Sequence, residues 1–204
     1  MPEAAVLTLF IPTFFLISIS PGMCMSLAMT LGMSVGVRRT MWMMLGEVVG
    51  VAFVAIAAVL GIAAIMLSHP AVFSVFKWVG GLYLFYLGIK MWRSPIDIQL
   101  SMQSKSISNT SLLSQGFITA IANPKGWAFM VALLPPFIDI AKPISIQLSV
   151  LVSIIMLSEL ICMLIYATGG KSLSKLLANN DKSQWLNRIS GVLLCAVGIW
   201  LALA

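Results

Sequence analysis

The sequence predicts an all-α integral membrane protein with six transmembrane helices. Of its 204 residues 60% are hydrophobic, enough to supply six membrane-spanning helices of about 20 residues each. Only 9% are charged, against roughly a quarter in a globular domain, so a water-soluble fold could not cover its surface. The apolar runs also lack the alternation of barrel strands: Val48 to Ala64 is apolar or glycine throughout, which favours helices.

Six apolar segments are long enough to cross a membrane, and we expect one helix in each. They cover approximately residues 6–33, 40–67, 71–92, 114–138, 144–168 and 188–204. We expect the first to be an uncleaved span, because a secretory signal begins with positive charge and the only early charged side chain is Glu3. A Ser-rich segment separates two groups of three spans. We therefore divide the chain into a first three-helix repeat at 1–93, a linker at 94–113 and a second repeat at 114–204.

Lysine and arginine are unequally divided between the two sides of these spans. One side holds Arg38, Arg39, Lys90, Arg93, Lys105, Lys171, Lys175, Lys182 and Arg188. The opposite loops hold only Lys77 and Lys142. Because cytoplasmic loops carry the excess of positive charge, we expect a cytoplasmic linker and both termini on the outer side of the membrane. The net charge of +6 is then a topology signal, and no nucleic-acid partner is expected.

The two halves resemble each other in sequence. Three alignments have similar offsets: Pro21 with Pro124, Glu47 with Glu159, and Gly81 with Gly191. Each half has an odd number of spans, so a direct repeat in the sequence becomes an inverted repeat in the membrane. Many secondary transporters are built in this way.

Helix breakers interrupt the first and fourth spans at matching places. Pro21-Gly22 follows Ser20 in the first span, and Asn123-Pro124-Lys125-Gly126 lies about ten residues into the fourth. Proline removes a backbone donor and clashes with the preceding turn, so each span becomes two half-helices or a kinked helix. The matched positions favour breaks, which in transporters mark the binding site.

The breaks bring an unusual charge into the membrane. A half-helix that restarts there presents free N–H groups and a partial positive charge, which suit an anionic group. Lys125 adds a full charge, which we expect to face a polar cavity or a carboxylate; its alternative is to extend toward the cytoplasmic interface.

Glu47 and Glu159 are the only acids well inside the spans, each among apolar neighbours. Intramembrane carboxylates commonly pair with a cation or exchange protons. We expect both to bind substrate and to take part in proton coupling, Glu159 in particular. The structural alternative is an ion pair with Lys125 or a hydrogen bond to a serine.

Sulfur and glycine form two further patterns. Met25, Met29 and Met33 recur at helical spacing beside Cys24, which suits Cu(I) but is also common in apolar packing. The three cysteines, Cys24, Cys162 and Cys195, have no C-x-x-C spacing, so no disulfide, metal site or cofactor is expected. Gly32-x-x-x-Gly36 and Gly46-x-x-x-Gly50 would allow close helix approach, within one subunit or in a homo-oligomer.

Several phrases of the sequence together resemble one family over nearly the whole chain. They are Ile19-Ser20-Pro21-Gly22, Leu45-Gly46-Glu47, residues 77–88 (KWVGGLYLFYLG), Gln115-Gly116-Phe117, Asn123-Pro124-Lys125-Gly126, Leu134-Pro135, and Glu159 with Tyr166. They resemble the LysE/RhtB family of bacterial amino-acid exporters. In one departure, Met23 stands where that family commonly has a second proline.

The resemblance implies a transporter rather than an enzyme, one that exports homoserine, threonine or another small amino acid by proton antiport. With the preceding observations, it gives a substrate site of Ser20, Pro21, Gly22, Glu47, Asn123, Pro124, Lys125, Gly126 and Glu159. The expected partners are the amino acid, protons and the lipid bilayer, and the resemblance implies that this bilayer is a bacterial inner membrane. Copper efflux through the methionines is the alternative function.

Overall fold

The computed structural model describes residues 4–68, 107–139 and 141–178, together with the positions 75, 78–79, 82, 85–86, 88–90, 92–93, 188, 191–192, 195–196 and 199. Their helices are α1 (Ala4–Ser18), α2 (Met23–Ser34), α3 (Val37–Ser68), α5 (Asn109–Ala122), α6 (Pro124–Leu133), the 3₁₀ helix η1 (Pro135–Phe137) and α7 (Ile144–Ala178). These residues contain no strand. Most of the expected third and sixth spans, and of the linker, lies outside the described residues.

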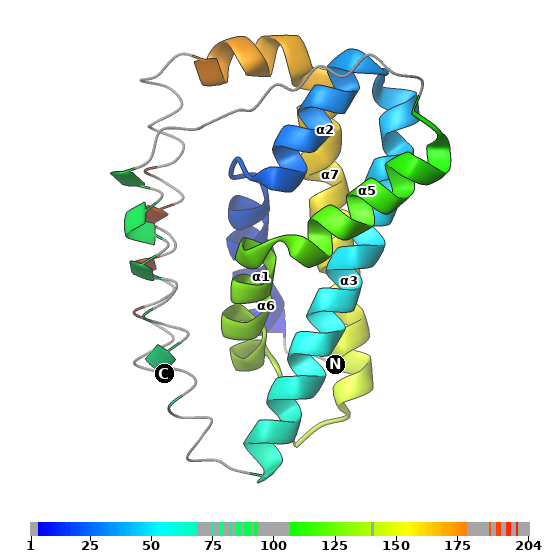
Figure 1. Ribbon diagram of the computed structural model, residues 1–204. Coiled ribbons are helices and arrows are strands. Elements are labelled where there is room, and N and C mark those ends of the chain that lie inside the picture. Colours follow the sequence, from blue (N-terminus) through cyan, green and yellow to red (C-terminus); the bar gives the residue numbers. More distant parts are fainter. Residues whose placement is uncertain are drawn as a thin grey trace.

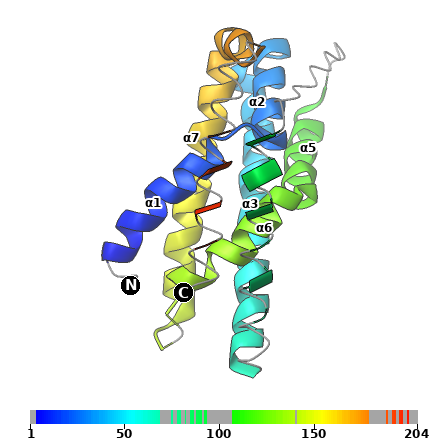
Figure 2. The same ribbon diagram turned by 90° about the vertical axis from the view of Figure 1, so that its left-hand side faces the viewer.

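Two helices, α3 and α7, are long and apolar enough to cross a membrane alone. The other candidates are two bent pairs, α1 with α2 at 57° and α5 with α6 at 55°. Counting each pair as one span gives four candidates among the described residues. The all-helical membrane fold is therefore confirmed, and both predicted breaks are present (Figures 1 and 2).

The helix boundaries follow local signals. The α2 helix ends at Ser34, and Gly36 has a φ of 85°, the left-handed conformation with which glycine commonly terminates a helix. The α5 helix begins at Asn109, five residues before the predicted start at 114. It starts early because the hydroxyl of Ser108 accepts a hydrogen bond from the N–H of Ser111 at 3.1 Å.

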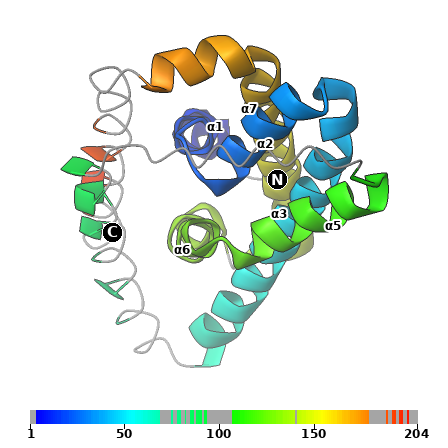
Figure 3. The same cartoon turned by 45° about the horizontal axis from the view of Figure 1, so that its top comes forward.

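Each bent pair packs mainly on the unbroken helix of the other half of the chain. The α5 and α6 helices lie against α3, and α1 and α2 lie against α7. Figure 3 looks along α1 and α6, which lie on the same side of the bundle. The turn between α2 and α3 and the last turns of α7 lie at one end of the molecule, opposite the start of α7 (Figure 1).

Glycines bring these helices into backbone contact. A Cβ at Gly46 would lie 1.9 Å from the carbonyl oxygen of Leu113 in α5. A Cβ at Gly32 would lie 2.4 Å from the carbonyl oxygen of Ala167 in α7. Both glycines therefore serve packing within one chain, the first of the two possibilities that the sequence leaves open.

Candidate functional site

The first break separates α1 from α2 at residues 19–22. Two backbone carbonyls at the end of α1 accept hydrogen bonds from side chains. The Ser20 hydroxyl donates to the carbonyl of Ile17 at 2.6 Å, and the Tyr166 hydroxyl donates to the carbonyl of Ile19 at 2.9 Å. At the start of α2, Gly22 is the N-cap and no described side chain caps the helix. The first-turn N–H groups of α2 therefore keep their capacity to bind an anion.

Met23 is the first residue of α2. Proline is well tolerated at this position of a helix but is not required there, because the first N–H has no partner within the helix in either case. The departure from the family pattern at Met23 is therefore compatible with an intact break.

The second break differs from the first, because its helix start is already capped. The Asn123 side chain accepts a hydrogen bond from the N–H of Lys125 at 3.1 Å, and Pro124 follows as the first residue of α6. At the end of α5, the indole of Trp127 donates to the carbonyl of Ile121 at 2.8 Å. The two helix starts at the breaks therefore differ: α6 is capped by Asn123, whereas α2 has no side-chain cap among the described residues.

The two breaks meet in space. The Lys125 amine donates a hydrogen bond to the Ser20 hydroxyl, and the Asn123 amide lies 3.7 Å from the Cys24 sulfur. The amine also lies 5.7 Å from the centre of the Phe129 ring, close enough for a cation–π interaction. Lys125 thus lies against the first break. It does not extend toward the cytoplasmic interface, which was the alternative.

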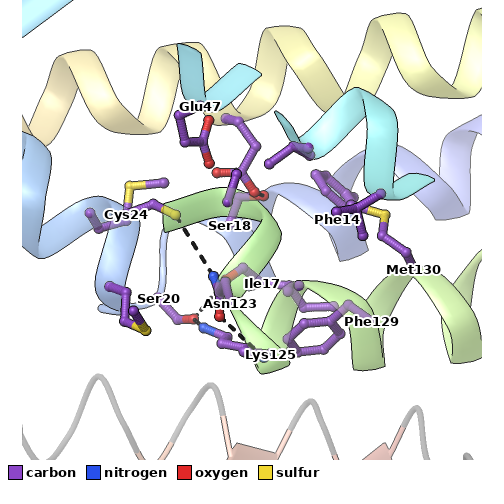
Figure 4. Close-up of a pocket in the computed structure, with 18 residues that line it drawn as sticks. Phe14, Ile17, Ser18, Ser20, Cys24, Glu47, Asn123, Lys125, Phe129 and Met130 are labelled. Atoms are coloured by element: carbon purple, nitrogen blue, oxygen red, sulfur yellow. Dashed lines mark hydrogen bonds between the residues drawn. The ribbon is translucent and has the colours of Figure 1, made fainter. Parts of the chain in front are cut away.

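A cavity of about 50 Å³, measured as the space open to the centres of water molecules, lies where the breaks meet. Seven of the nine predicted substrate residues line it: Ser20, Gly22, Glu47, Asn123, Lys125, Gly126 and Glu159. Pro21 and Pro124 are not in the lining. Figure 4 shows Lys125 and Glu47 on opposite sides of this cavity, with Cys24, Ser18 and Asn123 between them.

The two acids of the cavity have different surroundings. Glu159 accepts a hydrogen bond from the Ser18 hydroxyl at 2.9 Å, the serine contact that was its structural alternative. The Glu47 side chain is only 1% exposed, and among the described residues its Oε2 has no hydrogen-bond partner. No salt bridge within 4.0 Å joins Lys125 to either acid, all three being described residues. The ion-pair alternative is therefore not the arrangement in this structure.

Some residues of the cavity had no signal in the sequence. Ser18 faces Glu159 from α1, yet the repeat alignment gives no polar counterpart for it in the second half. Cys24, considered only for metal or thiol chemistry, lines the cavity, as do the aromatic rings of Phe14 and Phe129. Only the contact between distant helices reveals that these residues belong to the cavity.

The methionine stripe lies mostly in the packed core. Met29 is fully buried with Met43 and Met163, and a side-chain carbon of Met33 lies against Gly170 of α7. Met25 alone of the three lines the cavity. These contacts account for the stripe through packing between α2 and α7.

Comparison with known proteins relates the chain to membrane proteins of bacteria. An uncharacterised membrane protein of Vibrio cholerae is 27% identical over 195 residues, which cover 96% of this chain and 95% of that protein. A homoserine/homoserine lactone efflux protein of Salmonella typhimurium is 27% identical with the same coverage. A leucine efflux protein of an Enterobacter strain is 28% identical over 66% of this chain and 64% of its own. No solved structure matches the chain significantly. The model of the LysE type translocator family matches residues 15–204, so the chain belongs to this family of transporters.

Proposed function

We propose that the protein exports small zwitterionic amino acids, or close derivatives, in exchange for protons. One observation carries the proposal: a single cavity has a cationic side, at Lys125 and the open N-terminus of α2, has Glu47 on the opposite side, and includes Glu159 in its lining (Figure 4). A zwitterion matches both sides, its carboxylate toward Lys125 and its ammonium toward the glutamates.

The lining between the charges favours an uncharged substrate side chain. Phe14, Val51, Val54, Phe129 and Met130 are among the apolar residues that line the cavity. Relatives are named for the efflux of homoserine and homoserine lactone, and of leucine; of these, homoserine and leucine are zwitterions with uncharged side chains.

The arrangement of the helices supports alternating access between two inverted repeats. Each broken pair packs on the unbroken helix of the other half, as a two-fold relation between the halves would require. In this proposal both termini lie outside the inner membrane. The capped and uncapped breaks meet within the membrane. Substrate then reaches the cavity from the cytoplasm and leaves to the outside.

Proton exchange supplies enough energy for export. Exchanging one proton for one zwitterion moves one charge inward, and a membrane potential of about 100 mV contributes roughly 2.3 kcal/mol. That free energy supports an outward gradient of roughly 40-fold, before any contribution from a pH difference.

The test is efflux from proteoliposomes preloaded with labelled homoserine, threonine, leucine, lysine or a copper(I) complex, with and without a pH gradient. We expect a pH gradient to accelerate the loss of one or more neutral amino acids. Lys125→Gln should abolish this loss, and Lys142→Gln, outside the cavity, should not change it. Release of copper alone, or of no amino acid, would contradict the proposal.

A further inference from the structure

We propose that the two cavity glutamates have separate tasks: Glu47 carries the coupling proton, and Glu159 receives the ammonium group of the substrate. This assignment rests on the proposed exporter function and goes one step beyond it. It reverses the expectation from the sequence, which favoured Glu159 as the proton carrier. The reason lies in the partners that each carboxyl group has.

Glu159 is arranged as an anion that is open to the cavity. The Ser18 hydroxyl donates a hydrogen bond to its Oε1 at 2.9 Å, which stabilises the negative charge. Lys125 interacts with Glu159 electrostatically from the same cavity without a direct ion pair. Only one carboxylate oxygen receives the serine hydrogen bond, so Glu159 keeps the capacity to accept hydrogen bonds from an ammonium group.

Glu47 is arranged as a neutral acid. Its side chain is almost fully buried, and its Oε2 has no hydrogen-bond partner among the described residues. The titratable groups that face it are Cys24 of α2 and Glu159 and Cys162 of α7, none of which is a cation. The α5 helix packs against its backbone through Gly116, which has no side chain. A buried carboxylate in such surroundings is stable only with a proton bound.

The surroundings of Glu47 fit a proton better than a metal ion. Hard cations such as Ca²⁺ and Mg²⁺ need several oxygen ligands, whereas the nearest titratable group on α2 is the Cys24 thiol. No cluster of three or more metal-binding side chains occurs in the part of the chain that the structure describes. We therefore assign the coupling ion as H⁺.

The two tasks couple because both carboxyl groups share one cavity. With Glu47 protonated, Lys125 and Glu159 balance each other, and the empty cavity is neutral. If the Glu47 O–H bond breaks and the proton leaves to water, two carboxylates remain, and their repulsion is relieved when an ammonium group enters. Substrate binding on the cytoplasmic side thus favours proton release there, and substrate release outside favours proton uptake. Proton and substrate replace each other, which is antiport.

The transport test compares wild-type protein with Glu47→Gln, Glu159→Gln and the control Asp139→Asn, which changes a carboxyl group outside the cavity. We measure exchange of labelled for unlabelled homoserine or leucine at equal pH, and efflux driven by a pH gradient. Because Gln resembles the protonated form, Glu47→Gln should need more substrate for exchange, should still exchange at saturating substrate, and should lose the stimulation by the gradient. Glu159→Gln should lose both activities, and Asp139→Asn neither. The reverse pattern, with coupling lost only in Glu159→Gln, would overturn the assignment.

Infrared spectroscopy of the purified protein gives a readout that does not depend on transport. The carbonyl band of a protonated carboxyl group should be present without substrate in the wild type, Glu159→Gln and Asp139→Asn, and absent in Glu47→Gln. A band that persists in Glu47→Gln would place the proton elsewhere and overturn the inference, even if transport is normal. If the band follows Glu47 but no amino acid moves, the proposed function fails instead, and only the protonation of Glu47 stands. Unchanged thermal unfolding of Glu47→Gln, which loses no hydrogen bond at Oε2, confirms that the variant folds.

Discussion

At Gly116 the addition of a single methyl group should have a large structural effect. A Cβ added there would lie 1.9 Å from the carbonyl oxygen of Met43 and 2.9 Å from the backbone nitrogen of Glu47. Ordinary contact begins at 3.4 Å, so α5 and α3 would have to separate by about 1.5 Å in Gly116→Ala. The clash is with backbone, which cannot rotate away as a side chain does. Overpacking of this kind costs about 1–3 kcal/mol, and we expect a value at or above the upper end.

Thermal unfolding of the purified protein in detergent measures this effect. For a chain of this length, each kcal/mol lowers Tm by roughly 2–4 °C, so Gly116→Ala should melt about 6–12 °C below the wild type. The matched control is Gly61→Ala in α3, where no described atom lies within 4 Å of an added Cβ. Because alanine favours a helix over glycine by up to about 1 kcal/mol, the control should melt at or slightly above the wild-type temperature. Equal melting of both variants and the wild type would refute the packing argument.

Three other variants test separate features. Gly126→Ala meets no atom closer than 3.9 Å, so we expect an unchanged Tm but slower transport, because the methyl group narrows the cavity. Tyr166→Phe removes the hydrogen bond to Ile19 and should lower Tm by the few degrees that about 1 kcal/mol produces. The hydrogen bond from Lys142 holds the pKa of the Asp139 carboxyl below its usual value. Its stabilising effect is therefore present above pH about 4 and lost as the pH falls further, so the Tm difference from Asp139→Asn should disappear in acid.

The chemistry of the site could be predicted because its signals are local. Proline and glycine interrupt a helix wherever they stand in one, so the breaks at Pro21 and Asn123-Pro124 follow from the sequence. Charged residues inside apolar segments are costly to expose to lipid, so Lys125 and the two glutamates were expected to face a polar cavity. The helix breakers and the charged residues could be assigned to one site without knowing how the helices cross.

The partners of these residues could not be predicted, because they depend on the crossing of helices far apart in the sequence. Ser18 and Glu159 are 141 residues apart, and nothing in either segment indicates their hydrogen bond. The difference between the breaks also needed the structure, since it depends on whether the Asn123 side chain turns back onto its own helix. The early start of α5, in contrast, was readable from the capping serine at position 108.

The glycine contacts also determine how the molecule can move. Because the backbones are in contact at Gly46 and Gly116, we expect α3 and α5 to move together, and the contact at Gly32 leads to the same expectation for α2 and α7. The segments free to change their dihedral angles are then residues 19–22 and Asn123, with α1 and α6 as the levers on either side. Three of these hinge residues, Ser20, Gly22 and Asn123, also line the cavity. A solute that binds in the cavity therefore contacts the hinge residues directly. Opening or closing the cavity then needs no longer path through the helix bundle.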